Sequence, residues 1–294
     1  MNTFHTPVVL GEVIAGLDVR AGKRYIDATV GGGGHGWEIV KRGGNLLGID
    51  IDQEAIKFTK AKFKVQSSKS KVAGKWALVQ GNFRDLEKIA RENGFEKVDG
   101  ILFDLGVSSY QLDIAERGFS YRASDAPLDL RFDRSHGESA AGLLNRASRE
   151  ELYEIFAKLA EEELAGPIAD ALISTRRLKP IMTTGDLARV IEAIVKDKRK
   201  QIKVLSRVFQ GLRIAVNDEL NALKEGLNAA ARILRSGGRL AVISFHSLED
   251  RIVKRFLRGT GWRVVTRKPV CPSQAEIIAN PRSRSARLRI AEKI

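Results

Sequence analysis

Short apolar segments alternate with helical patterns over residues 24–104. Four segments rich in aliphatic and aromatic residues are predicted to be strands, at residues 25–28, 46–50, 76–80 and 98–104. Between them, residues 53–64 and 86–93 repeat apolar positions with the helical period, and Gly94 ends the second helix. This alternation predicts a parallel β-sheet covered by helices.

The alternation stops after Asp104. Residues 112–205 contain no convincing strand pattern, whereas helical periodicity is present in residues 148–164, 168–177 and 184–195. The α/β pattern then resumes with a long helix, a strand and a second helix, predicted at residues 207–234, 239–245 and 248–257. We therefore predict a first domain split between residues 1–111 and 206–294, with an inserted all-helical domain at residues 112–205.

A glycine-rich turn follows the first predicted strand. Gly31, Gly33 and Gly36 satisfy the Gly-x-Gly-x-x-Gly spacing, and Asp50 ends the next strand nineteen residues after Gly31. Glycines let the backbone approach a ligand, and an acid at that offset accepts hydrogen bonds from ribose hydroxyls but repels a 2′-phosphate. The pattern favours a nucleoside-containing cofactor, either a dinucleotide or S-adenosylmethionine. The alternative is a strand-to-helix turn that binds nothing.

Two apolar segments close the chain, at residues 262–266 and 286–291, and could pair as an antiparallel edge. Such a hairpin after the fifth parallel strand distinguishes a methyltransferase sheet from a second dinucleotide-binding half. The predicted fold is therefore α/β, a class I S-adenosylmethionine-dependent methyltransferase. It has a Rossmann-like, mostly parallel seven-stranded sheet with an antiparallel edge hairpin, and it carries the helical insertion. The glycine turn then needs only to leave room for the methionine part and to donate N–H bonds to its carboxylate.

Composition and charge predict a type of binding partner and a cellular compartment. The chain of 294 residues has 50 Lys and Arg against 36 Asp and Glu, a net charge of +14, which favours a polyanion such as nucleic acid. The single cysteine, Cys271, excludes an intrachain disulfide and fits a reducing compartment. The N-terminus lacks the regions of a signal peptide, and no apolar run approaches the roughly 18 residues of a membrane span. We expect a soluble, cytoplasmic protein without membrane contact.

Asp104 is the candidate catalytic residue because it ends the fourth strand, where ligands of open α/β sheets bind. An exocyclic amine is a poor nucleophile, and an acceptor that bonds its N–H localises the lone pair for attack on a sulfonium methyl. The alternative role is capping of the next turn. Cys271 suggests instead a covalent attack for carbon-5 methylation of a pyrimidine, but it lies far beyond the fourth strand in the sequence.

A basic stripe is predicted on the helix at residues 248–257. Its members are spaced i, i+3, i+4 and i+7: Arg251, Lys254, Arg255 and Arg258. Further cations that could contact phosphates are Arg282, Arg284, Arg287, Arg289, Lys196, Lys198, Arg199, Lys200 and Lys203. Each cluster alone could be a solvated face, but together with the net charge they favour RNA or DNA. His35, His246, Tyr110, Phe119 and Tyr121 could contact the cofactor or a base, or simply pack. We find no metal-ligand spacing.

Seven strings resemble those of the ribosomal small-subunit RNA methyltransferase H (MraW) family, nearly from end to end. They are His5-Thr6-Pro7-Val8, Gly32-Gly33-Gly34-His35, Asp104–Ser109, Ala115–Ser120, Phe209–Arg213, Ser244–Arg251 and Asn280–Ser285. The resemblance implies S-adenosylmethionine-dependent methylation of N4 of a cytidine in the decoding centre of 16S rRNA, in the small ribosomal subunit. It also implies that the insertion recognises the substrate.

The same resemblance assigns cofactor-binding residues, namely Gly33, Gly34, His35, Asp50, Phe83, Asp104 and Gln111. Phe83 would lie near the adenine. The chain departs from the family at Ala126–Phe132, which keeps Asp129 and Arg131, and at Lys203–Arg207, where relatives commonly have a His-Pro-Ala-Thr-type string. An NAD-dependent oxidoreductase and a non-catalytic RNA-binding protein remain the competing classes, and the choice between monomer and homodimer stays open.

Overall fold

The computed structural model describes residues 7–69, 72–121 and 124–294; His5 and Thr6 of the first family-like string lie outside these ranges. The chain divides into two compact units. The first, called here the sheet unit, comprises the chain up to Ser108 together with Leu220–Ile294, and the second, the helical unit, comprises Ser109–Glu219. None of the helices in the described residues combines the length and the apolar character that crossing a membrane requires.

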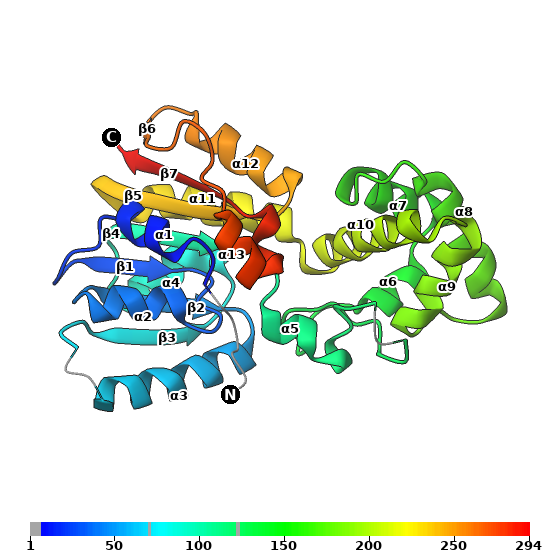
Figure 1. Ribbon diagram of the computed structural model, residues 1–294, viewed down its shortest axis with the longest axis horizontal. Helices are drawn as coiled ribbons and strands as arrows, with labels where there is room; N and C mark the ends of the chain where they lie inside the picture. The colour runs from blue at the N-terminus through cyan, green and yellow to red at the C-terminus, as the bar shows by residue number, and fades with distance from the viewer. Residues whose placement is uncertain (1–6, 70–71, 122–123) are drawn as a thin grey trace. The chain divides into compact units, whose positions relative to one another are not determined.

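The sheet unit contains one seven-stranded sheet (Figure 1). The strand order is β3-β2-β1-β4-β5-β7-β6; the first five strands are mutually parallel, and β7 pairs antiparallel with β5 and β6. This confirms the predicted fold class and the antiparallel edge. The strands are β1 (Arg24–Asp27), β2 (Asn45–Asp50), β3 (Trp76–Gln80), β4 (Val98–Asp104), β5 (Leu234–Ser244), β6 (Trp262–Val264) and β7 (Arg287–Lys293).

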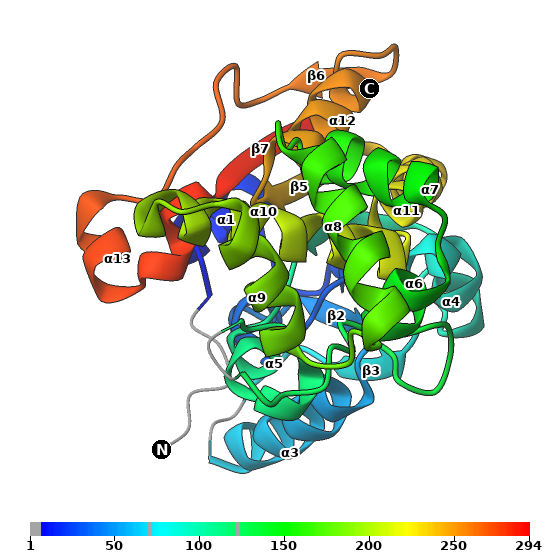
Figure 2. The same cartoon turned by 90° about the vertical axis from the view of Figure 1, so that its right-hand side faces the viewer.

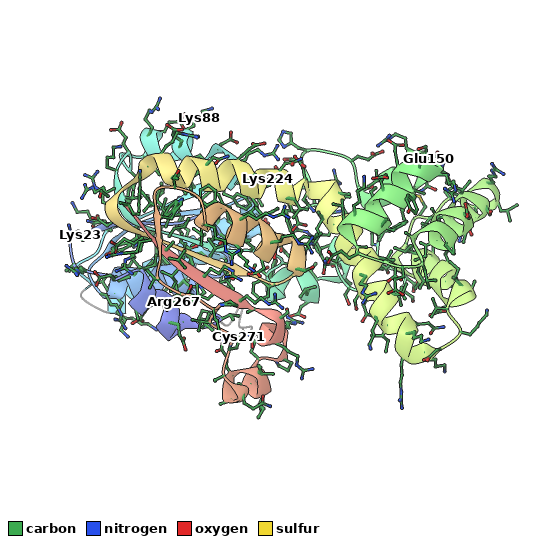
Figure 3. The ribbon with its side chains drawn as sticks, turned by 90° about the horizontal axis from the view of Figure 1, so that it is seen from above. Lys23, Lys88, Glu150, Lys224, Arg267 and Cys271 are labelled. Atoms are coloured by element: carbon green, nitrogen blue, oxygen red, sulfur yellow. The ribbon has the colours of Figure 1, made fainter. Side chains whose placement is uncertain are left out.

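Helices cover both faces of the sheet, which is why successive residues of the central strands are apolar. Ile101 and Phe103 of β4 join one core cluster and Leu102 joins the other, because side chains alternate between faces along a strand. The helices on the first face are α4 (Leu86–Glu92), α11 (Glu219–Ile233) and α12 (Ser247–Leu257). Those on the second are α1 (Leu10–Gly16), α2 (Gly34–Lys41) and α3 (Gln53–Lys69). Lys88 and Lys224 mark α4 and α11 in Figure 3.

The prediction of one long helix at residues 207–234 is wrong. Two helices occupy this region, α10 (Lys198–Asn217) and α11, and Asp218 between them has a left-handed backbone with φ 49°. Apolar periodicity continues across the break, and Asp is among the residues that tolerate this conformation, so the pattern gives no warning. The predicted domain division between residues 205 and 206 consequently falls inside α10.

The strand predicted at residues 239–245 also begins earlier, at Leu234. Ser236-Gly237-Gly238, expected to end the preceding helix, instead lies within β5, where the pairing with β4 shifts register between Val98 and Gly100. Gly237 has φ 76°, a backbone conformation that glycine adopts without strain. Glycine is therefore suited to this irregularity.

Figure 2 shows the helices of the helical unit. Its helices are α5 (Ser109–Asp113), α6 (Ala140–Arg146), α7 (Arg149–Glu154), α8 (Ala165–Leu178), α9 (Thr184–Ile194) and α10, with a π-helical turn at Ile155–Leu159. Capping boxes start two of them: Ser148 with Glu151 begins α7, and Thr183 with Asp186 begins α9. The insertion is helical as predicted. Among its described residues, extended pairing is limited to a single bridge between Pro127 and Thr183.

Candidate active site

Three acids end neighbouring parallel strands at one edge of the sheet. Asp27 ends β1, Asp50 ends β2 and Asp104 ends β4, and β1 lies between the other two strands. Asp27 is 1% exposed, and the side chain of Asp104 is 10% exposed. The strand order reverses at β1, so this edge is the position at which open α/β sheets bind ligands.

The turn after β1 is bonded to both neighbouring strand ends. The N–H of Gly31 donates to Oδ2 of Asp50 at 2.8 Å, and the N–H of Asp104 donates to the hydroxyl of Thr29 at 2.6 Å. The glycine turn therefore lies between the two acids that the sequence singled out, and their distances to it are fixed by hydrogen bonds.

Helix α3 holds the same turn from its other side. The Thr59 hydroxyl donates to the Gly31 carbonyl at 2.5 Å, and the Lys62 ammonium donates to the Gly32 carbonyl at 2.6 Å. Burial lowers the pKa of Lys62. Neither side chain was predicted to take part. The apolar period that locates α3 does not reveal which polar residues of the helix face the turn.

The glycines of the turn serve different purposes. A Cβ at Gly33 would lie 2.6 Å from both Phe63 and Thr59, and a Cβ at Gly34 would lie 2.9 Å from Pro7. Both positions therefore need glycine for packing. Gly31, with φ 48°, has only the Thr29 carbonyl near its missing side chain, at 3.8 Å, so the space beside it is open to a ligand.

Asp50 has the geometry that a nucleoside requires. Its Oδ1 accepts from the N–H of Asp52 at 2.9 Å, while Oδ2 accepts from Gly31. Two backbone bonds orient the carboxylate, whose oxygens are the kind of acceptor that ribose hydroxyls bind. A cofactor with free ribose hydroxyls and no 2′-phosphate, such as S-adenosylmethionine, fits an acid in this position.

Asp27 is a further site residue that sequence reasoning missed. The pKa of Asp27 is raised to about 8, chiefly by burial and next by the charge of Asp104, while hydrogen bonds from the N–H groups of Thr29 and Gly36 oppose the rise. Asp27 thus braces both ends of the glycine turn. It could have been found, because it ends a predicted strand as Asp50 and Asp104 do.

His35, in the first turn of α2, links Asp104 to the N-terminal segment. It is 4% exposed; its Nε2 lies 3.0 Å from the carbonyl of Val8, and its Nδ1 lies 3.6 Å from Oδ2 of Asp104. A carbonyl can only accept a hydrogen bond, so Nε2 carries a proton. The other ring nitrogen, Nδ1, therefore faces the carboxylate, and the contact is an ion pair only when the imidazole carries a second proton.

Two other residues assigned through the family resemblance lie in different settings. Phe83, in a 3-10 turn at Phe83–Asp85, packs edge-on against Phe103 with ring centroids 5.6 Å apart. Gln111 is buried on α5 of the helical unit, with 5% exposure. Their roles at the cofactor stay predictions, as do the cofactor contacts of Gly33, Gly34 and His35.

The predicted basic stripe is exposed along α12 and its C-terminal cap. Arg251, Lys254, Arg255 and Arg258 all reach the surface, while Val253 and Leu257 are buried. Two arginines expected to extend this cationic surface are committed elsewhere: Arg289 donates to Asp250 at 2.7 and 3.0 Å, and Arg287 at 3.4 Å. Although burial opposes its charge, these arginines lower the pKa of Asp250.

Other candidate residues have structural roles. The ring of Phe119 stacks on Phe132, the ring of Tyr121 meets Phe209, and His246 caps α12 by accepting from the N–H of Glu249. Cys271 is exposed, on the segment before α13 (Gln274–Ala279) (Figure 3). It lies on the segment that connects β6 to β7, and not at the edge of the sheet where Asp27, Asp50 and Asp104 end their strands.

Several known proteins are similar to this chain over its full length. Two curated proteins named ribosomal RNA small subunit methyltransferase H are each 45% identical to the chain and cover all of it. The one from Thermomicrobium roseum is matched over 95% of its own length and the one from Deinococcus deserti over 94%. A solved rRNA methylase from Streptococcus thermophilus is 11% identical, with a TM-score of 0.45 over 97% of this chain and 93% of that one. Residues 2–294 match the profile of a single family, and the chain therefore belongs to the MraW methylase family.

Proposed function

We propose that this protein transfers a methyl group from S-adenosylmethionine to the N4 amino group of a cytidine in the decoding centre of 16S rRNA, within the small ribosomal subunit. The observation that carries the proposal is the placement of two acids at one glycine turn: the Asp50 carboxylate accepts from Gly31, and the backbone N–H of Asp104 donates to Thr29. The names of the curated relatives support the same class of substrate.

Asp104 would act on the acceptor. When bound, S-adenosylmethionine supplies a methyl group on a sulfonium, which needs an electron pair from the amine nitrogen. A carboxylate that accepts a hydrogen bond from the cytosine amine raises the electron density on that nitrogen and fixes its direction. Thr29 holds the backbone of Asp104 in place for this role.

Asp50 and the glycine turn would hold the cofactor. The Asp50 carboxylate accepts from the ribose hydroxyls, and the open space beside Gly31 receives the rest of the ligand. Thr59 and Lys62 keep the turn from moving, because each bonds one of its carbonyls. A turn that is already fixed loses little further entropy when the ligand binds.

The exposed stripe Arg251, Lys254, Arg255 and Arg258 would contact phosphates of the RNA. Such contacts position the substrate without reading its sequence. Selection of one cytidine would then depend on the shape of the subunit and on the helical unit.

Two alternatives have clear tests. An NAD-dependent oxidoreductase would bind NADH, so titration with NADH and with S-adenosylhomocysteine separates the two classes. A carbon-5 methylase would need Cys271 as its nucleophile, and Cys271→Ser would then abolish transfer. Under the proposed N4 chemistry Cys271→Ser keeps full activity, since no covalent enzyme intermediate forms.

The decisive experiment is nucleotide mapping. Small subunits that lack the modification are incubated with the protein and S-adenosylmethionine, and mass spectrometry locates the new methyl group on the rRNA. The proposal predicts one N4-methylated cytidine in the decoding centre. A methyl group on carbon 5, or on another nucleotide, would overturn it.

A further inference from the structure

We infer that His35 is a positioning residue of the methylation reaction, taking from Asp104 the proton that the amine releases, and that the Val8–Val9 backbone, held by Glu276, sets its tautomer. This inference rests on the proposed function. It concerns residues of the sheet unit alone, and its parts are the strap Pro7–Val9, His35 on α2 and Glu276 on α13.

The strap has a strained backbone that a distant residue holds. Val9 adopts a left-handed conformation with φ 46° and ψ 42°, which is rare for a β-branched residue. Its N–H donates to Oε1 of Glu276 at 2.8 Å, across 267 positions of sequence, and its carbonyl accepts from Val13 at 3.0 Å. Val9 is 1% exposed. The conformation is therefore fixed from both sides.

This conformation presents the Val8 carbonyl to Nε2 of His35 at 3.0 Å. The proton of a neutral His35 consequently resides on Nε2, and the lone pair of Nδ1 points towards Oδ2 of Asp104, 3.6 Å away. Pro7 lies against Gly34, where a Cβ would be only 2.9 Å from it, so the strap also packs on the start of α2.

The reaction releases a proton, and the arrangement of Asp104 and His35 can receive it. The amine lone pair forms the new N–C bond while the C–S bond breaks, and its electrons stay on sulfur as a neutral thioether. The nitrogen then has one proton too many, which passes to Asp104 and from there to Nδ1 of His35. The products are a methylated amine, an anionic Asp104 and an imidazolium that releases its proton to solvent. No further co-reactant is needed.

The charged groups around His35 allow this transfer. Asp104 faces Nδ1, and Asp27 accepts from the N–H of Gly36, the next residue. Because burial keeps the Asp27 carboxyl largely protonated at neutral pH, it is a poor second acceptor for the proton. Glu276 is directed to the backbone of Val9 and acts on His35 only through the strap.

The test is single-turnover methylation of small subunits across pH, with S-adenosylhomocysteine affinity measured in parallel. His35→Gln keeps a donor for the Val8 carbonyl but removes the Nδ1 acceptor. We expect the wild-type rate to rise with pH, because only an imidazole without a proton on Nδ1 can accept one from Asp104. In His35→Gln that rise should vanish, and the rate at saturating S-adenosylmethionine should fall by about 10²-fold or more.

Two substitutions of Glu276 provide a matched pair of variants. Glu276→Gln retains an oxygen that accepts from Val9 and should preserve the wild-type pH profile, whereas Glu276→Ala should shift or flatten it. A wild-type profile in His35→Gln, or in Glu276→Ala, overturns the inference while leaving the proposed function intact. A wild-type protein that never methylates the subunit overturns the proposed function itself.

Discussion

The sheet unit and the helical unit carry charge in different ways. Residues 1–108 and 220–294 contain 32 Lys and Arg against 18 Asp and Glu, whereas residues 109–219 contain 18 of each. The net charge of +14 therefore belongs wholly to the sheet unit, and residues 220–294 supply most of it, with 16 basic against 5 acidic residues. Long-range attraction to phosphate thus comes from the unit that contains the candidate active site.

The helical unit is neutral only on average. Residues 176–207 contain ten Lys and Arg against three Asp and Glu, and the rest of the unit carries the opposite excess. Uneven charge of this kind orients a polyanion but adds little to its overall attraction. The comparison suggests that one unit supplies affinity and the other supplies orientation.

Buried acids provide the sharpest contrast between the units. Asp104→Asn should lower the methylation rate by about 10²–10⁴-fold, because the amide is a weaker acceptor for the amine proton. Asp186→Asn, a buried acid of the helical unit, should leave the chemical step unchanged. Single-turnover rates at saturating subunit, with S-adenosylhomocysteine binding as the folding control, measure both. Equal losses in the two variants would remove the special role of Asp104.

A second comparison between the units uses one glycine with a positive φ from each. Gly33→Ala should destabilise the sheet unit by about 2–4 kcal/mol, since the methyl group would meet Phe63 and Thr59 and the backbone has φ 70°. Gly137→Ala in the helical unit, with φ 73° and no neighbouring atom within 4 Å, should cost only about 1 kcal/mol. Segment-resolved hydrogen exchange measures the stability of each unit separately. Similar losses of stability in the two variants would mean that Phe63 and Thr59 of α3 move aside easily for the added methyl group.

Salt dependence tests the difference in charge. Changing Arg251, Lys254 and Arg255 to Gln should lower the slope of log affinity against log salt by about 2, at roughly 0.7 per lost contact with single-stranded RNA. The same change at Lys198, Arg199 and Lys200 of the helical unit should lower it by less than about 1. An unchanged slope in the first variant would remove the stripe from the RNA-binding surface.

The pH dependence of stability should have opposite signs in the two units. The pKa of Asp27 is raised to about 8, so its stabilising contribution is complete in acid and is lost as pH rises from about 4 through 8. Although burial opposes its charge, hydrogen bonds from Met182 and Thr183 lower the pKa of Asp186, whose contribution is present near neutrality and is lost in acid. Asp27→Asn should flatten the first trend between pH 4 and 8, and Asp186→Asn should flatten the second below about pH 4, both read by segment-resolved hydrogen exchange.

The repeating parts of the fold were predictable from sequence. The bounds of β3 and β4 agree with the apolar segments. In β4 the reason is burial on both faces, which makes a strand continuously hydrophobic. The break at Asp218 was not predictable, since a single left-handed residue leaves the helical period intact on both sides. It shifted the expected end of the insertion.

In the site, sequence located the glycine turn, Asp50 and Asp104 but not what supports them. Thr59, Lys62 and Asp27 act through hydrogen bonds between elements, and such bonds depend on side-chain direction in the folded chain. The pairing of Arg289 with Asp250 has the same origin. Charge counts along a sequence cannot separate a cation that is engaged internally from one that remains available.

The bond between Val9 and Glu276 has a consequence for biosynthesis. It joins positions 267 residues apart, so it can form only when nearly the whole polypeptide has left the ribosome. Strands β1 to β4 can associate earlier, but the nascent protein would keep an unfastened amino-terminal end until α13 is made. The newly made enzyme would thus gain its finished catalytic geometry as one of the last events of its own folding.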